Sequence, residues 1–79
     1  SVLQFYAGVA LMEQGQHQKA VGQFQQIQKG DLFYTEAQWY MALSCISEDD
    51  IKNAKELLNL LVVGESKYSG YAETILDEL

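Results

Sequence analysis

The sequence contains no arginine and no proline, and only one cysteine and one histidine among its 79 residues. Its 11 acidic residues outnumber 5 lysines, and the resulting net charge of −6 disfavours contact with nucleic acid or an anionic membrane surface. A single cysteine excludes an internal disulfide framework and a zinc site built on cysteines. No apolar run approaches the roughly 20 residues of a membrane span. We therefore expect a small acidic domain with no nucleic-acid partner and no direct membrane contact.

Apolar residues make up 48% of the chain, which indicates a globular fold rather than disorder. The length allows a single domain, residues 1–79. The chain lacks an initiator Met and enters an apolar pattern almost at once. This start predicts that the domain is excised from a longer protein, in which case any targeting signal lies elsewhere.

The spacing of apolar residues predicts five helices and no strand. Because proline is absent, glycines and small polar clusters mark the boundaries between the segments. The expected helices lie before Gly15, from Gln18 to Lys29, from Glu36 to Ile46, from Asp50 to Val63, and from Ser69 onward.

Local signals refine these boundaries. Gly30 is placed to act as a left-handed cap of the second helix. Ser1 with Gln4, and Thr35 with Gln38, have the spacing of capping boxes. The fourth segment is apolar around most of its circumference, which predicts burial on more than one side, against the third and fifth helices.

A shift of 34 residues aligns the chain with itself. The identical pairs are Ala20 with Ala54, Gly30 with Gly64, Gln4 with Gln38, Tyr6 with Tyr40, and Tyr34 with Tyr68. Similar pairs include Phe24 with Leu58 and Ile27 with Leu61, and Gly15 falls on Asp49 at the turn between helices. A helix–turn–helix unit of this length, present twice, predicts a repeat architecture.

With this period and this order of small and large residues, the chain resembles the tetratricopeptide repeat (TPR) family. Small residues stand at Gly8 and Ala20 in the first unit and at Ala42 and Ala54 in the second. We expect them to face one another across each helix pair, where a close approach requires small side chains. The chain departs from the family pattern in having glutamine in place of the first-helix tryptophan and no closing proline.

The resemblance implies an all-α fold of antiparallel helical hairpins stacked as a short right-handed superhelix. Residues 1–34 would form the first TPR-like repeat, residues 35–68 the second, and residues 69–79 a C-terminal capping helix. The second unit is also similar to repeats in large bacterial TPR proteins, some of them envelope-anchored. The localisation therefore stays open between the cytoplasm and a membrane-tethered or periplasmic part of a longer bacterial protein, with this segment soluble in either case.

The family resemblance also implies a binding surface. In TPR arrays the first helix of each pair lines a concave face that holds a peptide or a partner's helix. The corresponding partner-binding residues here are Val2, Phe5, Tyr6, Val9, Met12, Trp39, Tyr40, Leu43 and Ile46. This apolar and aromatic face, with Trp39 as its anchor, predicts a non-catalytic protein–protein interaction module. The alternative is a scaffold segment that packs on other parts of its own chain or homodimerises through the same face.

We expect no catalytic, cofactor-binding or metal-binding residue. His17 lies near a turn with no catalytic partner at a recognisable spacing, and Cys45 is expected to be a buried free thiol. The acidic run Glu48–Asp50 is typical of helix N-capping and a solvated surface. A contact for a basic partner, or a weak Ca²⁺ site, is the alternative interpretation of that run.

Overall fold

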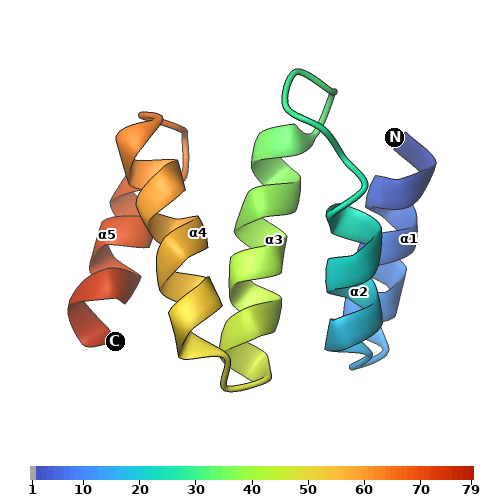
Figure 1. Ribbon diagram of the computed structural model, residues 1–79, viewed down its shortest axis with the longest axis horizontal. Helices are drawn as coiled ribbons and strands as arrows, with labels where there is room; N and C mark the ends of the chain where they lie inside the picture. Colours follow the sequence, from blue (N-terminus) through green and yellow to red (C-terminus); the bar gives the residue numbers. More distant parts are fainter. Residues whose placement is uncertain (1) are drawn as a thin grey trace.

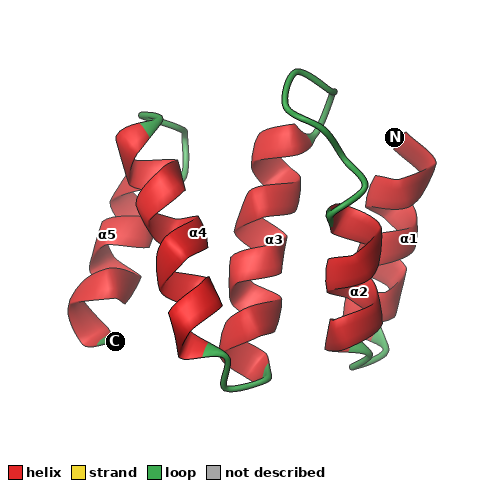
Figure 2. Ribbon diagram, viewed as in Figure 1, coloured by secondary structure: helices red, strands yellow, loops and turns green. Residues whose placement is uncertain are grey.

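The computed structural model describes residues 2–79, which form five α-helices and no strand (Figures 1 and 2). The helices are α1 (Val2–Glu13), α2 (His17–Phe24), α3 (Tyr34–Ser47), α4 (Ile51–Val63) and α5 (Ser69–Glu78). The predicted all-α class with five helices is therefore confirmed. Ser1, and with it the first capping box, lies outside the described residues.

Each helix packs against the next one along the chain, and α1 also approaches α3. In Figure 1, α2 and α4 stand in front of α1 and α5, and α3 lies between the two groups. The shortest dimension of the Cα trace is 16 Å, which fits a layer about two helices thick, since packed helix axes are about 8–10 Å apart. The arrangement leaves two broad faces, one formed by α2, α3 and α4 and the other by α1, α3 and α5.

Two clusters of buried side chains hold the helices together. The first contains Phe5, Ala20, Phe24, Ile27, Ala37 and Met41, and the second contains Ala42, Leu58, Leu61 and Ala72. Both clusters draw residues from α3, and Leu57 packs against both. Helix α3 is therefore the shared wall of the two halves of the molecule.

Burial follows the 34-residue repeat. Both members of four pairs are buried: Gly8 with Ala42, Ala20 with Ala54, Phe24 with Leu58, and Ile27 with Leu61. Gly8 faces the ring of Phe24 rather than the predicted Ala20. A Cβ built at Gly8 would lie 2.5 Å from a Phe24 ring carbon. The small residues thus allow close helix approach, and the large residue of the second helix fills the space that Gly8 leaves.

The turns that end α1 and α3 share one backbone geometry. Gly15 and Asp49 both have positive φ, at 77° and 60°. The following residue in each turn donates its N–H to a carbonyl five residues earlier, from Gln16 to Leu11 at 2.9 Å and from Asp50 to Cys45 at 2.8 Å. This is the hydrogen bonding of a Schellman cap. The 34-residue match of Gly15 with Asp49 therefore extends to the backbone. The match of Gly30 with Gly64 does not, since φ is 97° at Gly30 and −76° at Gly64.

Helix α2 is shorter than predicted, because it ends at Phe24 rather than near Lys29. The side chain of Asp31 accepts a hydrogen bond from the backbone N–H of Gln28 at 3.0 Å, which stabilises a turn in place of a further helical turn. Gly30 has the expected positive φ of 97°, but it lies in the connection to α3 and does not cap α2.

The second predicted capping box is wrong. Helix α3 begins at Tyr34, with Phe33 as its N-cap, and no side chain caps it. Phe33 has φ of 69°, which is rare for a bulky residue, and its ring stacks on Phe5 with centroids 4.5 Å apart. Aromatic packing, rather than a polar cap, fixes the start of this helix.

Helix α4 packs against both α3 and α5, as the sequence predicted. Its apolar circumference is nevertheless not fully covered, since Leu60 is 61% exposed and Val63 is 80% exposed. Leu3 on α1 is also exposed. These side chains place apolar surface at the outside of the described fold.

Candidate functional site

The nine residues predicted to bind a partner fall into three environments. Phe5 belongs to the first buried cluster, and Val9, Met12 and Tyr40 pack against that cluster as half-buried side chains. Trp39 and Ile46 pack against the second cluster, and Leu43 is half-buried. Only Val2 and Tyr6 are exposed. All nine residues lie on α1 and α3, but Phe5 serves the core and not an open surface.

Trp39 lies against two tyrosines that the sequence analysis did not place in the site. Its ring is stacked on Tyr68, with centroids 5.0 Å apart and planes 7° from parallel. Tyr71 of α5 lies 6.2 Å away at 46°, and this side chain is 67% exposed. The 34-residue match of Tyr34 with Tyr68 was the available signal for one of them. Tyr71 carried no such signal, because it lies beyond the second unit.

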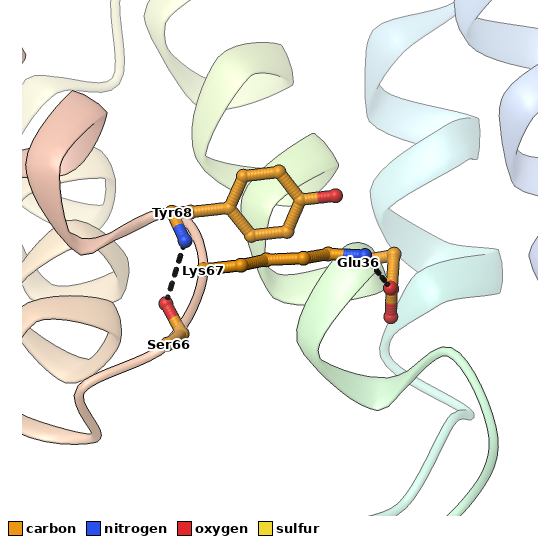
Figure 3. Close-up of polar contacts among 4 residues, drawn as sticks. All are labelled: Glu36, Ser66, Lys67 and Tyr68. Atoms are coloured by element: carbon orange, nitrogen blue, oxygen red, sulfur yellow. Dashed lines mark hydrogen bonds and ion pairs between the residues drawn. The ribbon is translucent and has the colours of Figure 1, made fainter.

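An ion pair holds the Tyr68 segment to α3 (Figure 3). The Nζ of Lys67 lies 2.5 Å from Oε2 of Glu36 and 5.3 Å from the centroid of the Tyr68 ring. The hydrogen bond from Lys67 lowers the pKa of Glu36, and the same bond raises the pKa of Lys67. Burial raises the pKa of Tyr68. The contact therefore joins the entrance of α5 to the first turn of α3 beside the Trp39 stack.

Serine side chains shape the turn that leads into α5. The hydroxyls of Ser66 and Ser69 both donate to the carbonyl of Leu61, at 3.1 and 2.9 Å. The Ser66 hydroxyl also accepts the backbone N–H of Tyr68 at 3.2 Å (Figure 3). These bonds fix the backbone of Tyr68 and so help to orient its ring against Trp39.

A second aromatic group contains Tyr6 of α1. Tyr6 is 58% exposed and meets the rings of Phe5 and Phe33 edge-on, at 5.5 and 6.0 Å. Exposed tyrosines therefore lie on α1 and α5, the helices on either side of α3 in Figure 1, and Trp39 lies on α3. We call Tyr6, Trp39 and Tyr71 together the aromatic face.

The opposite face contains a cleft of about 550 Å³ between α2 and α4, floored by α3. Its apolar lining includes Val21, Met41 and Leu57, and its carboxylates are Glu48, Asp50 and Glu56. We call this hollow the α2–α4 cleft. None of the nine predicted residues lines it. Sequence reasoning missed it because its residues come from three helices, and no single helix shows them as a stripe.

Cys45, His17 and Asp50 carry groups that could take part in chemistry, but each has the surroundings of a structural residue. Cys45 is buried, as predicted, and burial raises the pKa of its thiol, with a smaller contribution from the charge of Asp50. His17 begins α2 and is half-buried. Asp50 is the N-cap of α4 and accepts from the Asn53 backbone N–H at 3.4 Å, which confirms the capping role expected for the acidic run. No group of three potential metal ligands occurs among residues 2–79.

In comparisons with known proteins, no protein-family model, curated protein or solved structure matches the chain. In the part of the chain that the structure describes, no helix has both the length and the apolar character to cross a membrane.

Proposed function

We propose that the chain is a non-catalytic protein–protein interaction module, and that its aromatic face binds an apolar peptide or helix of a partner. The observation that carries this proposal is the exposure of two tyrosines, Tyr6 at 58% on α1 and Tyr71 at 67% on α5, the latter beside the half-buried Trp39 of α3. Tyrosine and tryptophan are the residues that most often dominate binding energy at protein interfaces. Their large rings bury much area at low cost in side-chain entropy.

The ordering of Trp39 supports the proposal. One side of its ring is already held by Tyr68, and the Glu36–Lys67 ion pair fixes the segment that carries Tyr68. A side chain that is ordered before binding loses less conformational freedom when the partner arrives. The aromatic face is thus partly prepared for a partner without being covered by its own chain.

The repeat geometry supports a TPR-like assignment for the fold. Equivalent turns and equivalent buried pairs recur at a spacing of 34 residues, as in that family. We include the right-handed stacking of the two hairpins, and the role of α5 as a closing helix, in this proposal.

Peptide display against the immobilised chain tests the proposed function. Bound peptides are recloned and measured against Tyr6→Ser, Tyr71→Ser and the matched control Val63→Ser, which removes an exposed apolar side chain from α4. We expect each tyrosine variant to weaken binding by roughly tenfold or more, as for a hot-spot residue, and Val63→Ser to leave it unchanged. Peptides that lose affinity for Val63→Ser, and not for the tyrosine variants, would refute the aromatic face as the binding surface.

Self-association through the aromatic face is the second candidate. It is favoured by the exposure of the aromatic rings of Tyr6 and Tyr71, since exposed apolar surface often marks an interface. The same tyrosine variants separate the two candidates by light scattering. A dimer that dissociates in Tyr6→Ser or Tyr71→Ser supports self-association, whereas a wild-type monomer supports a partner of different sequence.

A further inference from the structure

The α2–α4 cleft is a second surface, and its properties do not depend on the aromatic face. Its volume of about 550 Å³ falls within the range of roughly 300–1,000 Å³ that is usual for ligand pockets. Its floor is apolar, with Met41 and Leu57 among its lining residues, and Leu60 at its edge is 61% exposed. The hollow therefore has room for one long side chain together with a neighbouring apolar one.

The polar lining of the cleft is negative. Glu48, Asp50 and Glu56 contribute carboxylates, and no lysine is among the described residues that line it. Among residues 2–79, the one salt bridge joins Glu36 to Lys67. None of the three carboxylates of the cleft is therefore neutralised by a salt bridge. Asp50 is engaged as a helix cap by Asn53, which leaves Glu48 and Glu56 to meet a ligand.

A buried hydroxyl also lies at the floor of the cleft. Ser44 of α3 is fully buried, and among the described residues its Oγ has no hydrogen-bond partner. Buried polar groups are almost always paired in folded proteins, so this hydroxyl beneath the cleft lacks the partner that it would normally have. Because Ser44 is 0% exposed, a ligand donor reaches the hydroxyl only when the neighbouring side chains of the cleft move. Amide side chains of Gln18, Gln25 and Asn53 add further acceptors around it.

Arginine is the side chain that best matches this lining. Its guanidinium carries five N–H donors in a planar fork and no acceptor, so it can bond several carboxylate, amide and hydroxyl oxygens together. Its aliphatic stem can lie along apolar side chains such as Met41 and Leu57 while the charged head meets the carboxylates. Lysine offers three donors from a single point and fits a multi-acceptor site less well.

We propose that the α2–α4 cleft binds an arginine side chain presented by an apolar segment of a protein partner. Glu48 and Glu56 hold the guanidinium, and Val21, Met41 and Leu57 contact the stem and the adjoining apolar residue. Small movements of these lining side chains let the Ser44 hydroxyl accept one guanidinium N–H group. The chain itself contains no arginine, so the cleft cannot be filled by a copy of this chain in the same way.

Nuclear magnetic resonance of the isotope-labelled chain tests the proposal directly. The probe is the capped peptide acetyl-Gly-Leu-Arg-Leu-Gly-amide, compared with peptides that carry citrulline or lysine in place of arginine. Citrulline keeps the shape and removes the charge. We expect the arginine peptide to shift the amide signals of Val21, Ser44 and Leu57, and to bind about tenfold tighter than the citrulline peptide because charge-assisted hydrogen bonds are lost.

Two double variants separate a specific site from the general attraction of a negative chain. Glu48→Gln with Glu56→Gln removes two charges from the cleft, and Glu73→Gln with Asp77→Asn removes the same number from exposed positions on α5. We expect the first to weaken arginine-peptide binding about tenfold and the second less than about twofold. Circular dichroism confirms that each variant keeps its helices.

Several results would overturn the proposal. They are equal loss in the two double variants, equal affinity for the citrulline or lysine peptide, absence of any saturable shift in the cleft, or shifts confined to Tyr6, Trp39 and Tyr71. Shifts confined to those three residues would place the peptide on the aromatic face. The proposal for the cleft can therefore fail while the proposed function of the aromatic face is still supported.

Discussion

Gly8 shows how one residue sets the distance between two helices. A Cβ at this position would lie 2.5, 2.7 and 2.8 Å from three ring carbons of Phe24, which is fully buried. We expect Gly8→Ala to lower the free energy of unfolding by about 1–3 kcal/mol, the usual cost of overpacking a core. Urea unfolding measures this loss.

Gly22 is the matched control for Gly8, because it also lies within a helix. No atom lies within 4 Å of a Cβ built there, and its φ is ordinary. Gly22→Ala should raise the free energy of unfolding by about 0.5–1 kcal/mol, since alanine favours the helix. Equal effects of the two substitutions would show that Gly8 is not in close contact with Phe24.

Cys45 is expected to be a slow nucleophile. Burial raises the pKa of its thiol, the Asp50 carboxylate adds to that rise, and only the thiolate reacts. At neutral pH we expect its reaction with an aromatic disulfide to be at least about tenfold slower in the folded chain than in urea. A rate in the folded chain that matches the rate in urea would contradict the burial of this side chain.

Glu36 and Lys67 predict a pH dependence of stability. The folded-state pKa of Glu36 is lowered by Lys67, so its contribution is complete above the usual carboxyl pKa and is lost as the pH falls through the lowered value. The pKa of Lys67 is raised, so the contribution of the pair to stability is also lost as the pH rises through that raised value. The effect is small because solvent screens an exposed lysine.

The measurement for this pair is unfolding of wild type and Glu36→Gln across a pH series. Wild type should be the more stable at neutral pH, and the difference should vanish as Glu36 becomes protonated in acid. A difference that persists unchanged in acid would mean that the variant acts through packing and not through the ion pair.

Helix ends show what can be predicted at the scale of the element. The sequence predicted the turn near Gly15 and its equivalent at Asp49, because both the period and the small polar residues mark it. It did not predict the early end of α2, since that end depends on a hydrogen bond between Gln28 and Asp31 in the following segment. It also missed the start of α3, which depends on a ring of α1 that is distant in sequence.

Substitutions at Gly15 and Asp49, in the two equivalent turns, are expected to change stability in opposite directions. Gly15 and Asp49 both have positive φ, but only glycine adopts it without strain. We expect Gly15→Ala to lower the free energy of unfolding by about 1 kcal/mol and Asp49→Gly to leave it unchanged or raise it slightly. Thermal unfolding compares the two, and a loss in Asp49→Gly as large as in Gly15→Ala would contradict the shared geometry.

The surroundings of the residues proposed to bind a partner were only partly predictable, because they depend on how the helices meet. The stripe of Phe5 and Trp39 predicted that both side chains are apolar packing positions on α1 and α3, and both pack against the buried clusters. Periodicity alone could not show that Phe5 would be covered by Phe33, or that Tyr68 would stack on Trp39. The α2–α4 cleft depends on the space between three helices, which has no counterpart in the pattern of any one of them.

At the scale of the whole molecule, α3 joins two buried clusters into one unit with two separate faces. The aromatic face consists of Trp39 and the exposed Tyr6 and Tyr71, and the α2–α4 cleft carries carboxylates without salt bridges over an apolar floor. The central claim is that the aromatic face is open to a partner in the isolated chain.

Acrylamide quenching of Trp39 fluorescence, measured over a wide range of protein concentration, tests this claim most directly, because Trp39 is the single tryptophan. We expect partial quenching, since Tyr68 covers one side of the ring, and a quenching constant that does not change with protein concentration. A quenching constant that falls as concentration rises would show that a second copy of the chain covers Trp39, and would contradict an aromatic face that is free to bind a partner.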